Sequence, residues 1–225
     1  MKMTKKISVI IDFDDTLVES NTARDVLLEF VPSEYEEIAN LYKSKKINFK
    51  TYQELSFEKA FSIANTKKIA NSSIKNSKIR IGFKDLVLYC EKNEIDIFIL
   101  SSGLNMYIEP VLKEFKNNIK IIAADVIFDK NNNCSFEYQK SYDDMCSPDW
   151  GICKCKTVDS LKENNFLIYI GDGITTDLCA SKKCDQIFAL NPLYNGLLEK
   201  KIIVDKFVDF NQIEKYLSAL QRKID

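Results

Sequence analysis

Short runs of apolar, partly β-branched residues recur along this chain, and stretches with helical spacing separate most of them. Continuous apolar runs are typical of strands that are buried on both faces of a parallel sheet. Strands that alternate with helices predict an α/β fold with a doubly wound, Rossmann-like parallel sheet. In such a fold, ligands bind where the carboxyl ends of the strands meet. The expected strands are Ile7–Asp12, Ile95–Leu100, Ile119–Ala123, Phe166–Ile170 and Gln186–Leu190.

The stretch from Asn21 to Lys78 breaks this alternation, because its apolar residues have helical spacing and no strand run is evident. We expect a small helical insertion after the first strand. The predicted division is a core domain of residues 1–18 and 80–225, with the insertion at residues 19–79. Asp129–Cys134 is expected to be a turn between two short strands, and Phe210–Lys223 a closing amphipathic helix.

Length and charge limit the classes of partner. The chain has 225 residues, of which 45% are apolar or aromatic, enough for a sizeable core. Its formal net charge of -1 provides no global field for nucleic acid or an anionic membrane, so we expect neither partner. The first apolar run is too short for a signal peptide, and no run reaches a membrane-spanning length. Seven cysteines, an odd number, favour reduced thiols and a cytoplasmic location.

The chain contains no histidine. This excludes His-based acid–base catalysis, Ser-His-Asp triads and His-ligated zinc. A zinc or redox site built on cysteines is the alternative, but no C-x-x-C pair occurs and buried cysteine is often a small apolar residue. The cysteines in question are Cys146, Cys153, Cys155, Cys179 and Cys184.

Three carboxylates, Asp12, Asp14 and Asp15, directly follow the first expected strand. Carboxylates crowded at a strand end repel one another, which suggests a hard cation held by oxygen ligands. In an extended segment Asp12 and Asp14 point to the same side, so one can attack a phosphorus atom while the other handles a proton. A solvated acidic turn is the alternative.

Two further signals suit phosphate binding. Ser101 and Ser102, followed by Gly103, come after the second strand, where hydroxyl and backbone N–H groups can bind phosphate oxygens. Lys154 precedes an expected helix and can neutralise a phosphoryl group. The alternatives are a Ser-Gly turn or helix N-cap for the serines, and a solvated surface charge for the lysine.

Asp172 and Asp177 form the last signal, Gly-Asp-Gly followed by a second acid, after the fourth strand. Asp172 at that tip can ligate magnesium, and Asp177 can orient a neighbouring ligand. A plain turn is the alternative. All four signals lie at or soon after the carboxyl ends of expected parallel strands, so the fold gathers them into one crevice.

The ordered motifs DFDDT, LSSG, the Lys154 region and GDGITTD resemble those of the haloacid-dehalogenase-like superfamily of phosphohydrolases, from Ile7 to Ala189. The resemblance implies that Asp12 is the nucleophile and Asp14 the acid and base. It implies that Ser101 and Lys154 hold the phosphoryl group. It also implies Mg²⁺ as cofactor, bound by Asp12, the carbonyl of Asp14 and Asp172, with Asp177 in support.

Two points stay open within this resemblance. Lys156 is the fallback for the third motif, although Lys154 places Val158 and Leu161 at the apolar positions of the following helix. GDGITTD has one more residue between its acids than related motifs, which leaves the role of Asp177 open.

The insertion resembles the helical cap of phosphoserine phosphatases and of the methionine-salvage hydroxyketo-methylthiopentenyl-phosphate phosphatase branch. Asn21 stands where phosphoserine phosphatases have a glutamate, and Lys50 is nearest to their arginine. Both departures argue against phosphoserine. The segments TARDVLLEF and GICKC are similar to the methionine-salvage branch and its relatives that act on phosphocholine, phosphoethanolamine or pyridoxal phosphate. The expected partner is a small phosphorylated metabolite, and the expected assembly a monomer or homodimer.

Three alternatives use the same kind of site. A phosphoaspartate signalling module has its nucleophile in the middle of a shorter chain, whereas Asp12 lies in the first strand. A non-catalytic sensor of phosphorylated metabolites is expected to lack Asp12 or Asp14. A phosphotransferase or phosphomutase passes the aspartyl-phosphate to an alcohol instead of water.

Overall fold

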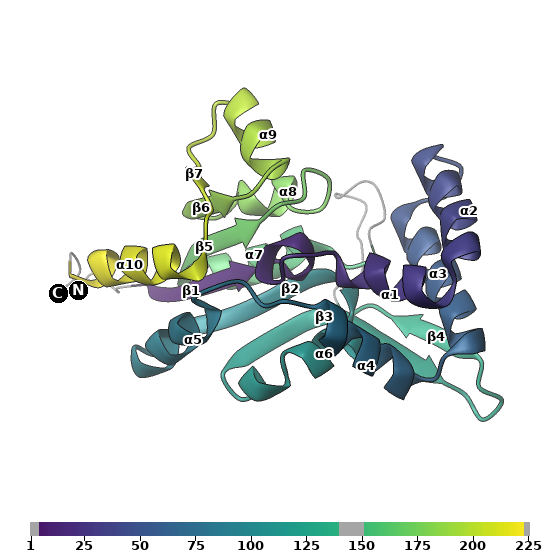
Figure 1. Cartoon of the computed structure of the whole chain (residues 1–225). Coiled ribbons are helices and arrows are strands. Elements are labelled where there is room, and N and C mark those ends of the chain that lie inside the picture. The colour runs from purple at the N-terminus through teal and green to yellow at the C-terminus, as the bar shows by residue number, and fades with distance from the viewer. Residues whose placement is uncertain (1–4, 140–150, 223–225) are drawn as a thin grey trace.

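A twisted sheet with helices on both faces forms the body of the protein in the computed structural model, which describes residues 5–139 and 151–222 (Figure 1). The sheet order is β4-β3-β2-β1-β5-β6-β7, and all neighbouring strands are parallel except the antiparallel pair β3 and β4. The chain crosses from β1 to opposite sides of the sheet, which confirms the doubly wound α/β fold. The strands are β1 (Lys6–Ile11), β2 (Asp96–Leu104), β3 (Ile119–Phe128), β4 (Cys134–Glu137), β5 (Asn165–Gly171), β6 (Gln186–Ala189) and β7 (Asp205–Lys206).

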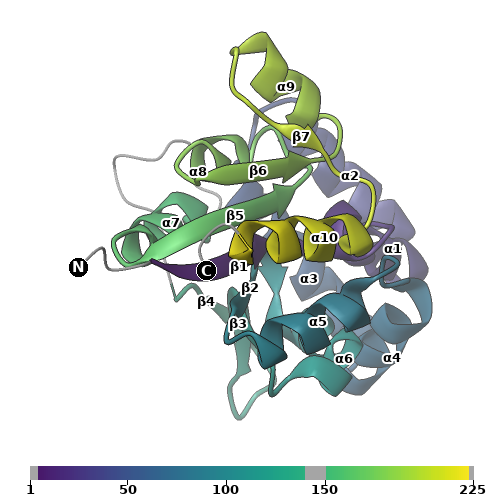
Figure 2. The ribbon, with the colours of Figure 1, turned by 90° about the vertical axis from the view of Figure 1, so that its left-hand side faces the viewer.

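Helices cover both faces of the sheet, as Figure 2 shows, with α7 and α8 on one face and α5, α6 and α10 on the other. This arrangement buries the strands from both sides, and Val9, Ile10 and Ile11 of β1 have no exposed surface. Burial on two faces explains why the first strand is a continuous apolar run. The core helices are α5 (Phe83–Lys92), α6 (Asn105–Val111), α7 (Lys154–Lys162), α8 (Leu178–Ser181), α9 (Leu193–Glu199) and α10 (Phe210–Gln221).

Four further helices form the insertion between β1 and α5; α1, α2 and α3 lie beyond the carboxyl ends of the strands, and α4 packs beside α6 (Figure 1). Three of them begin at an asparagine whose side chain accepts a backbone N–H of the first turn: Asn21, Asn48 and Asn65. Such caps fix where each helix starts. The helices are α1 (Thr22–Phe30), α2 (Pro32–Lys43), α3 (Phe49–Ile63) and α4 (Thr66–Asn76).

The two segments that join the insertion to the core run side by side. Val18 pairs with Ile79 in an antiparallel bridge. The Glu19 N–H donates to the Lys78 carbonyl at 2.9 Å. The insertion therefore leaves and re-enters the core at one place, next to the turn that carries the first acidic motif.

Two strands continue by several residues beyond their predicted carboxyl ends. The strand β2 continues to Leu104, so that Ser101 and Ser102 lie within its last residues instead of in a turn. The strand β3 continues to Phe128 because its second half pairs with β4. The turn predicted at Asp129–Cys134 therefore joins one long strand to a short one.

The remaining predicted elements agree with the structure, and α10 ends at Gln221 whereas Lys223 lies outside the described residues. Within residues 5–139 and 151–222, no helix has the length and apolar character needed to cross a membrane.

Candidate active site

A cavity of about 190 Å³ lies between the carboxyl ends of the strands and the helical insertion. Six of the seven predicted site residues line it, and Asp177 is fully buried beside it. The core contributes Asp12, Asp14, Asp15, Ser101, Ser102, Gly103, Tyr107, Lys154, Asp172, Gly173 and Thr176, and the insertion and its linker contribute Asn21, Ala23, Leu27, Phe49, Tyr52, Gln53 and Phe57. The core side is thus polar and charged, and the insertion side is mostly apolar.

Asp12 is the first residue after β1, and its N–H donates to the Ile170 carbonyl of β5 at 2.9 Å. The chain then makes one wide turn, Phe13–Leu17, whose backbone is not helical at Asp14 and Asp15, and Asp15 has a φ of 59°. The Arg80 side chain holds this turn, because it donates from Nε to the Thr16 carbonyl at 2.9 Å and from Nη2 to the Asp15 carbonyl at 3.2 Å. Hydrogen bonds to the backbone of the acidic motif, from β5 on one side and from Arg80 on the other, therefore hold it in place.

Lys154, the first residue of α7, lies beneath the cavity with its ammonium between two buried carboxylates. Its Nζ is 2.5 Å from Asp12 Oδ1 and 2.6 Å from Asp177 Oδ1. Burial by itself lowers the pKa of Lys154, but the charges of Asp12 and Asp177 outweigh it and hold that pKa above its ordinary range. Burial also raises the pKa of Asp12, and the Lys154 charge opposes that rise. The ammonium stays charged and offsets the negative charge of the site.

Asp177 is occupied by contacts within the protein. Its Oδ1 also accepts the Tyr169 hydroxyl at 2.9 Å, and its Oδ2 accepts the Gly173 N–H at 2.9 Å and the Asp172 N–H at 3.2 Å. A Cβ on Gly171 would lie 2.6 Å from Asp177 Oδ2, so the close approach of this carboxylate requires glycine there. Asp177 positions Lys154 and the loop that carries Asp172.

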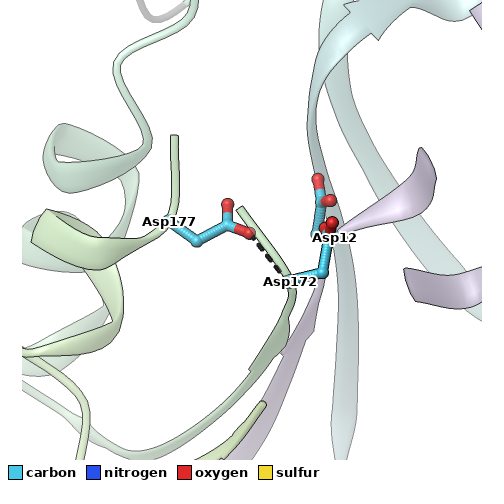
Figure 3. Close-up of side chains that lie close together, drawn as sticks. All are labelled: Asp12, Asp172 and Asp177. Carbon is cyan, nitrogen blue, oxygen red and sulfur yellow. Dashed lines mark hydrogen bonds between the residues drawn. The ribbon is translucent and has the colours of Figure 1, made fainter. Parts of the chain in front are cut away.

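Three carboxylates, those of Asp12, Asp172 and Asp177, have oxygens within 4.8 Å of one another (Figure 3). The Thr16 hydroxyl donates to Asp172 Oδ1 at 3.1 Å. Burial, with the nearby Asp177 and Asp15 charges, raises the pKa of Asp172 to about 6. A set of carboxylate oxygens of this kind fits a hard divalent cation such as Mg²⁺. Because the Asp177 oxygens already accept four hydrogen bonds, Asp12 and Asp172 have more free ligand capacity.

The Asp14 carboxylate is held from two sides, by the Thr22 N–H at 2.7 Å from Oδ1 and by the Tyr107 hydroxyl at 3.0 Å from Oδ2. Burial raises the pKa of Asp14 to about 6, although the hydrogen bonds from Tyr107 and Thr22 oppose the rise. A carboxyl group with that pKa exchanges protons readily near neutral pH. A Cβ on Gly103 would lie 1.8 Å from the Tyr107 hydroxyl oxygen, so Tyr107 can reach Asp14 only past a glycine.

The two serines differ in their use of hydrogen bonds. The Ser101 hydroxyl oxygen accepts the Gly103 N–H at 3.0 Å. The Ser102 hydroxyl is buried and has no hydrogen-bond partner in the described part of the chain. Both residues line the cavity, where hydroxyl donors can bind phosphate oxygens.

Of three further residues named in the sequence analysis, two lie away from the cavity and one lines it. Lys156 is exposed and does not line the cavity. The Lys50 ammonium lies 5.2 Å from the centre of the Tyr138 ring and not in the cavity. Asn21 lines the cavity, and its amide donates to Asp15 Oδ2 at 3.2 Å.

The cysteines give no support to the zinc alternative. The six described cysteines are free thiols, and the metal-ligating group found in the described ranges contains aspartates alone. Cys146 lies outside the described residues.

Sequence reasoning missed Tyr107, Thr16, Thr22 and Gln53 as parts of the site. Among the aromatic residues of the insertion, Phe49, Tyr52 and Phe57 line the cavity, whereas Phe61, Tyr35 and Tyr42 do not. Tyr107 lies on α6, four residues after Gly103, in a segment with no motif of its own. A glycine followed four residues later by a tyrosine could be recognised as part of the site only once the fold showed that Gly103 and Tyr107 lie against each other.

Comparison with known proteins identifies the family to which the chain belongs. The sequence model of a family described as Putative Phosphatase matches residues 7–206. The chain is 28% identical over 216 residues to 2-hydroxy-3-keto-5-methylthiopentenyl-1-phosphate phosphatase of Bacillus cereus (strain ATCC 10987 / NRS 248), covering 95% of this chain and 97% of that protein. It is 27% identical over 218 residues to the protein of the same name from Bacillus thuringiensis (strain Al Hakam), with the same coverage.

Solved structures agree on the fold. A phospho-aspartyl intermediate analogue of phosphoserine phosphatase superposes with a TM-score of 0.66 at 19% identity and covers 95% of this chain and 99% of its own. A phosphoserine phosphohydrolase-like protein from Francisella tularensis has a TM-score of 0.61 at 23% identity, with 96% and 99% covered. At these identities the likeness concerns the fold alone, which is that of the haloacid-dehalogenase-like proteins.

Proposed function

Because the chain belongs to the family described as Putative Phosphatase, we propose that it hydrolyses a small phosphomonoester through an aspartyl-phosphate on Asp12, with Mg²⁺ as cofactor. The protein is a phosphatase of the haloacid-dehalogenase type. The observation that carries the finer proposal is the buried Lys154 ammonium, shared between Asp12 and Asp177 at the cavity. A carboxylate nucleophile that approaches a phosphate dianion needs such a counter-charge.

In the first step, an Asp12 carboxylate oxygen attacks the phosphorus atom, and the bond from phosphorus to the leaving alcohol breaks. Asp14 in its acid form donates a proton to the departing oxygen. The raised pKa of Asp14, about 6, supports this role, because the carboxyl group must be protonated at this point. Ser101, Ser102 and Lys154 hold the transferred phosphoryl group.

In the second step, the Asp14 carboxylate accepts a proton from a water molecule, whose oxygen attacks the phosphorus atom. The bond between phosphorus and Asp12 breaks, and phosphate and the free Asp12 carboxylate result. Asp14 thereby returns to its acid form. Thr22 and Tyr107 keep its oxygens in place through both steps.

Asp12, Asp172 and the backbone carbonyl of Asp14 would hold Mg²⁺, with Asp177 in support. The crowded carboxylates of Asp12, Asp172 and Asp177 support this donor set. The cation supplies positive charge for the phosphate oxygens when it is bound.

The helical insertion acts as a cap in this proposal, with residues 19–79 as the cap domain and residues 1–18 and 80–225 as the core domain. The paired linkers at Val18 and Ile79 support this division. A cap over the cavity excludes water and favours a small substrate.

The first candidate substrate is the ester named for the Bacillus relatives, 2-hydroxy-3-keto-5-methylthiopentenyl-1-phosphate. Two observations favour it over phosphoserine. Asn21 replaces an acidic residue beside the cavity, and Lys50 lies against Tyr138 instead of in the cavity. An amino acid substrate needs charged partners for its ammonium and carboxylate groups.

Phosphate release from this ester, from phosphoserine and from phosphocholine tests the proposal, with and without Mg²⁺. The matched variant is Asp12→Asn, which keeps the shape of the side chain but lacks the nucleophilic oxygen. We expect Mg²⁺-dependent release in the wild type and a loss on the order of 10⁴-fold or more in the variant. Release at equal rates from both proteins would refute the nucleophile. Transfer of phosphate to an added alcohol would identify a phosphotransferase, and binding without turnover a sensor.

A further inference from the structure

The cap wall of the cavity is uncharged. Its residues from α1 and α3 are two aliphatic residues, three aromatic residues and one amide, namely Ala23, Leu27, Phe49, Tyr52, Phe57 and Gln53. Burial, followed by a hydrogen bond with Tyr35, raises the pKa of Tyr52, so this phenol also stays neutral. The charged groups that line the cavity all come from the core side. The cap wall therefore suits a leaving alcohol that is uncharged and partly apolar.

Gln53 is the exception to the apolar character of this wall. It is only 4% exposed, and neither its amide nitrogen nor its amide oxygen has a hydrogen-bond partner among the described residues. Buried amides in proteins are almost always paired with protein groups or with ordered water. An unpaired amide beside a cavity therefore indicates that the partner is a molecule inside the cavity.

We infer that Gln53 is a specificity-determining residue, which binds an uncharged oxygen function on the leaving alcohol of the substrate. The amide nitrogen donates to a keto or hydroxyl oxygen, and the amide oxygen accepts from a hydroxyl group. The rings of Phe49, Tyr52 and Phe57 pack against the apolar remainder. This inference rests on the proposed phosphatase mechanism, because it concerns the alcohol half of the same ester.

The selectivity expected from such a residue is asymmetric. A buried polar group that is left unpaired by a substrate without oxygen functions penalises that substrate. Replacing Gln53 by leucine removes the group that needs a partner and keeps a similar volume. The variant should then accept the two kinds of alcohol equally well.

The test compares pentyl phosphate with its dihydroxy derivative, which carries hydroxyl groups on the second and third carbons. We expect the wild type to prefer the dihydroxy ester by at least about tenfold in kcat/KM. Gln53→Leu should reduce this ratio to about one, through a gain on pentyl phosphate and a loss on the dihydroxy ester. Gln53→Met provides the same comparison if the leucine variant does not fold.

Ser56→Ala is the matched control. Ser56 lies on α3, one turn after Gln53, is also buried with an unpartnered hydroxyl in the described chain, and does not line the cavity. This variant should keep the wild-type ratio. If both Gln53 variants still prefer the dihydroxy ester, or if the wild type shows no such preference, the role of Gln53 is refuted. The proposed phosphatase function is not affected by either result. Absence of Mg²⁺-dependent hydrolysis of either ester overturns the proposed function, and this inference with it.

Discussion

At the scale of single residues, one ammonium group balances two of the buried carboxylates of the site. Lys154 Nζ lies 2.5 Å from Asp12 and 2.6 Å from Asp177, and its side chain is 3% exposed. Removal of one partner of a buried ion pair leaves an uncompensated charge. We expect Lys154→Met to lower the free energy of unfolding by about 3–5 kcal/mol at neutral pH, measured by urea denaturation.

Lys156→Met is the control for this prediction, since Lys156 is exposed two residues further on. Its free energy of unfolding should change by no more than about 0.5 kcal/mol, and phosphatase activity should be retained. Equal losses in the two variants would contradict the assignment of Lys154 to the third motif.

The hydrogen bond between Tyr107 and Asp14 predicts a pH effect. Asp14 must be protonated in the first step, so kcat/KM should fall as the pH rises above its pKa of about 6. The Tyr107 hydroxyl stabilises the carboxylate and lowers that pKa. Tyr107→Phe should therefore raise the pKa of Asp14 and move the descending limb of the pH profile to higher pH.

The leaving group supplies the control for the pH effect. Nitrophenolate departs without a proton. With nitrophenyl phosphate, kcat/KM should therefore fall less steeply above pH 6 in both the wild type and Tyr107→Phe. If the descending limb of the kcat/KM profile lies at the same pH in Tyr107→Phe as in the wild type, the titration of Asp14 does not cause that limb.

At the scale of elements, the residues that follow strands were predictable, as was Lys154 at the start of α7, whereas the site residues within helices α3 and α6 were not. Asp12 and Asp172 directly follow apolar runs, and parallel strands bring their carboxyl ends to one edge whatever the details of packing. Tyr107 and Gln53 lie on helices, whose orientation depends on tertiary contacts. Phe57 of α3 stacks on Tyr107 of α6, with ring centres 5.7 Å apart, and no sequence spacing encodes that contact.

The linkers of the cap predict a further effect at this scale. Arg80, on the returning linker, donates to the carbonyls of Asp15 and Thr16 and so holds the turn that positions Asp14. Arg80→Met should leave these carbonyls without that donor and lower kcat by about tenfold or more, because small misplacements of reacting groups are costly. Steady-state kinetics with the preferred ester measures the change.

Lys78→Met is the matched change on the same linker. The Lys78 side chain is 73% exposed in its ion pair with Glu19, and exposed pairs contribute little. Its kcat should stay within about twofold of the wild type. If Arg80→Met changed kcat as little as Lys78→Met, the Arg80 hydrogen bonds would not be needed to hold the turn.

At the scale of the whole molecule, the two halves of the cavity have separate tasks. The core, through the strand ends, their loops and the start of α7, supplies every charged group that lines the cavity, and the helical insertion supplies an uncharged wall. The sheet edge can therefore bind the phosphoryl group that all substrates share. The cap contacts the alcohol part, in which the substrates differ. Substitutions of the α3 residues that line the cavity should change substrate preference, and substitutions at the strand ends should change turnover of every ester.

Binding of Mg²⁺ should stabilise the whole fold, because the carboxylates of Asp12 and Asp172 come together only in the folded chain. At Mg²⁺ concentrations about a hundredfold above Kd, the stabilisation is about 2.7 kcal/mol, or roughly 5–10 °C in Tm for a chain of this size. The pKa of Asp172 is raised to about 6, so protons compete with the cation below that pH. The Tm increase should therefore be large at pH 7.5 and small at pH 5.5, as measured by scanning calorimetry. Asp172→Asn should lose most of the increase at both pH values, and an undiminished increase would place the cation elsewhere.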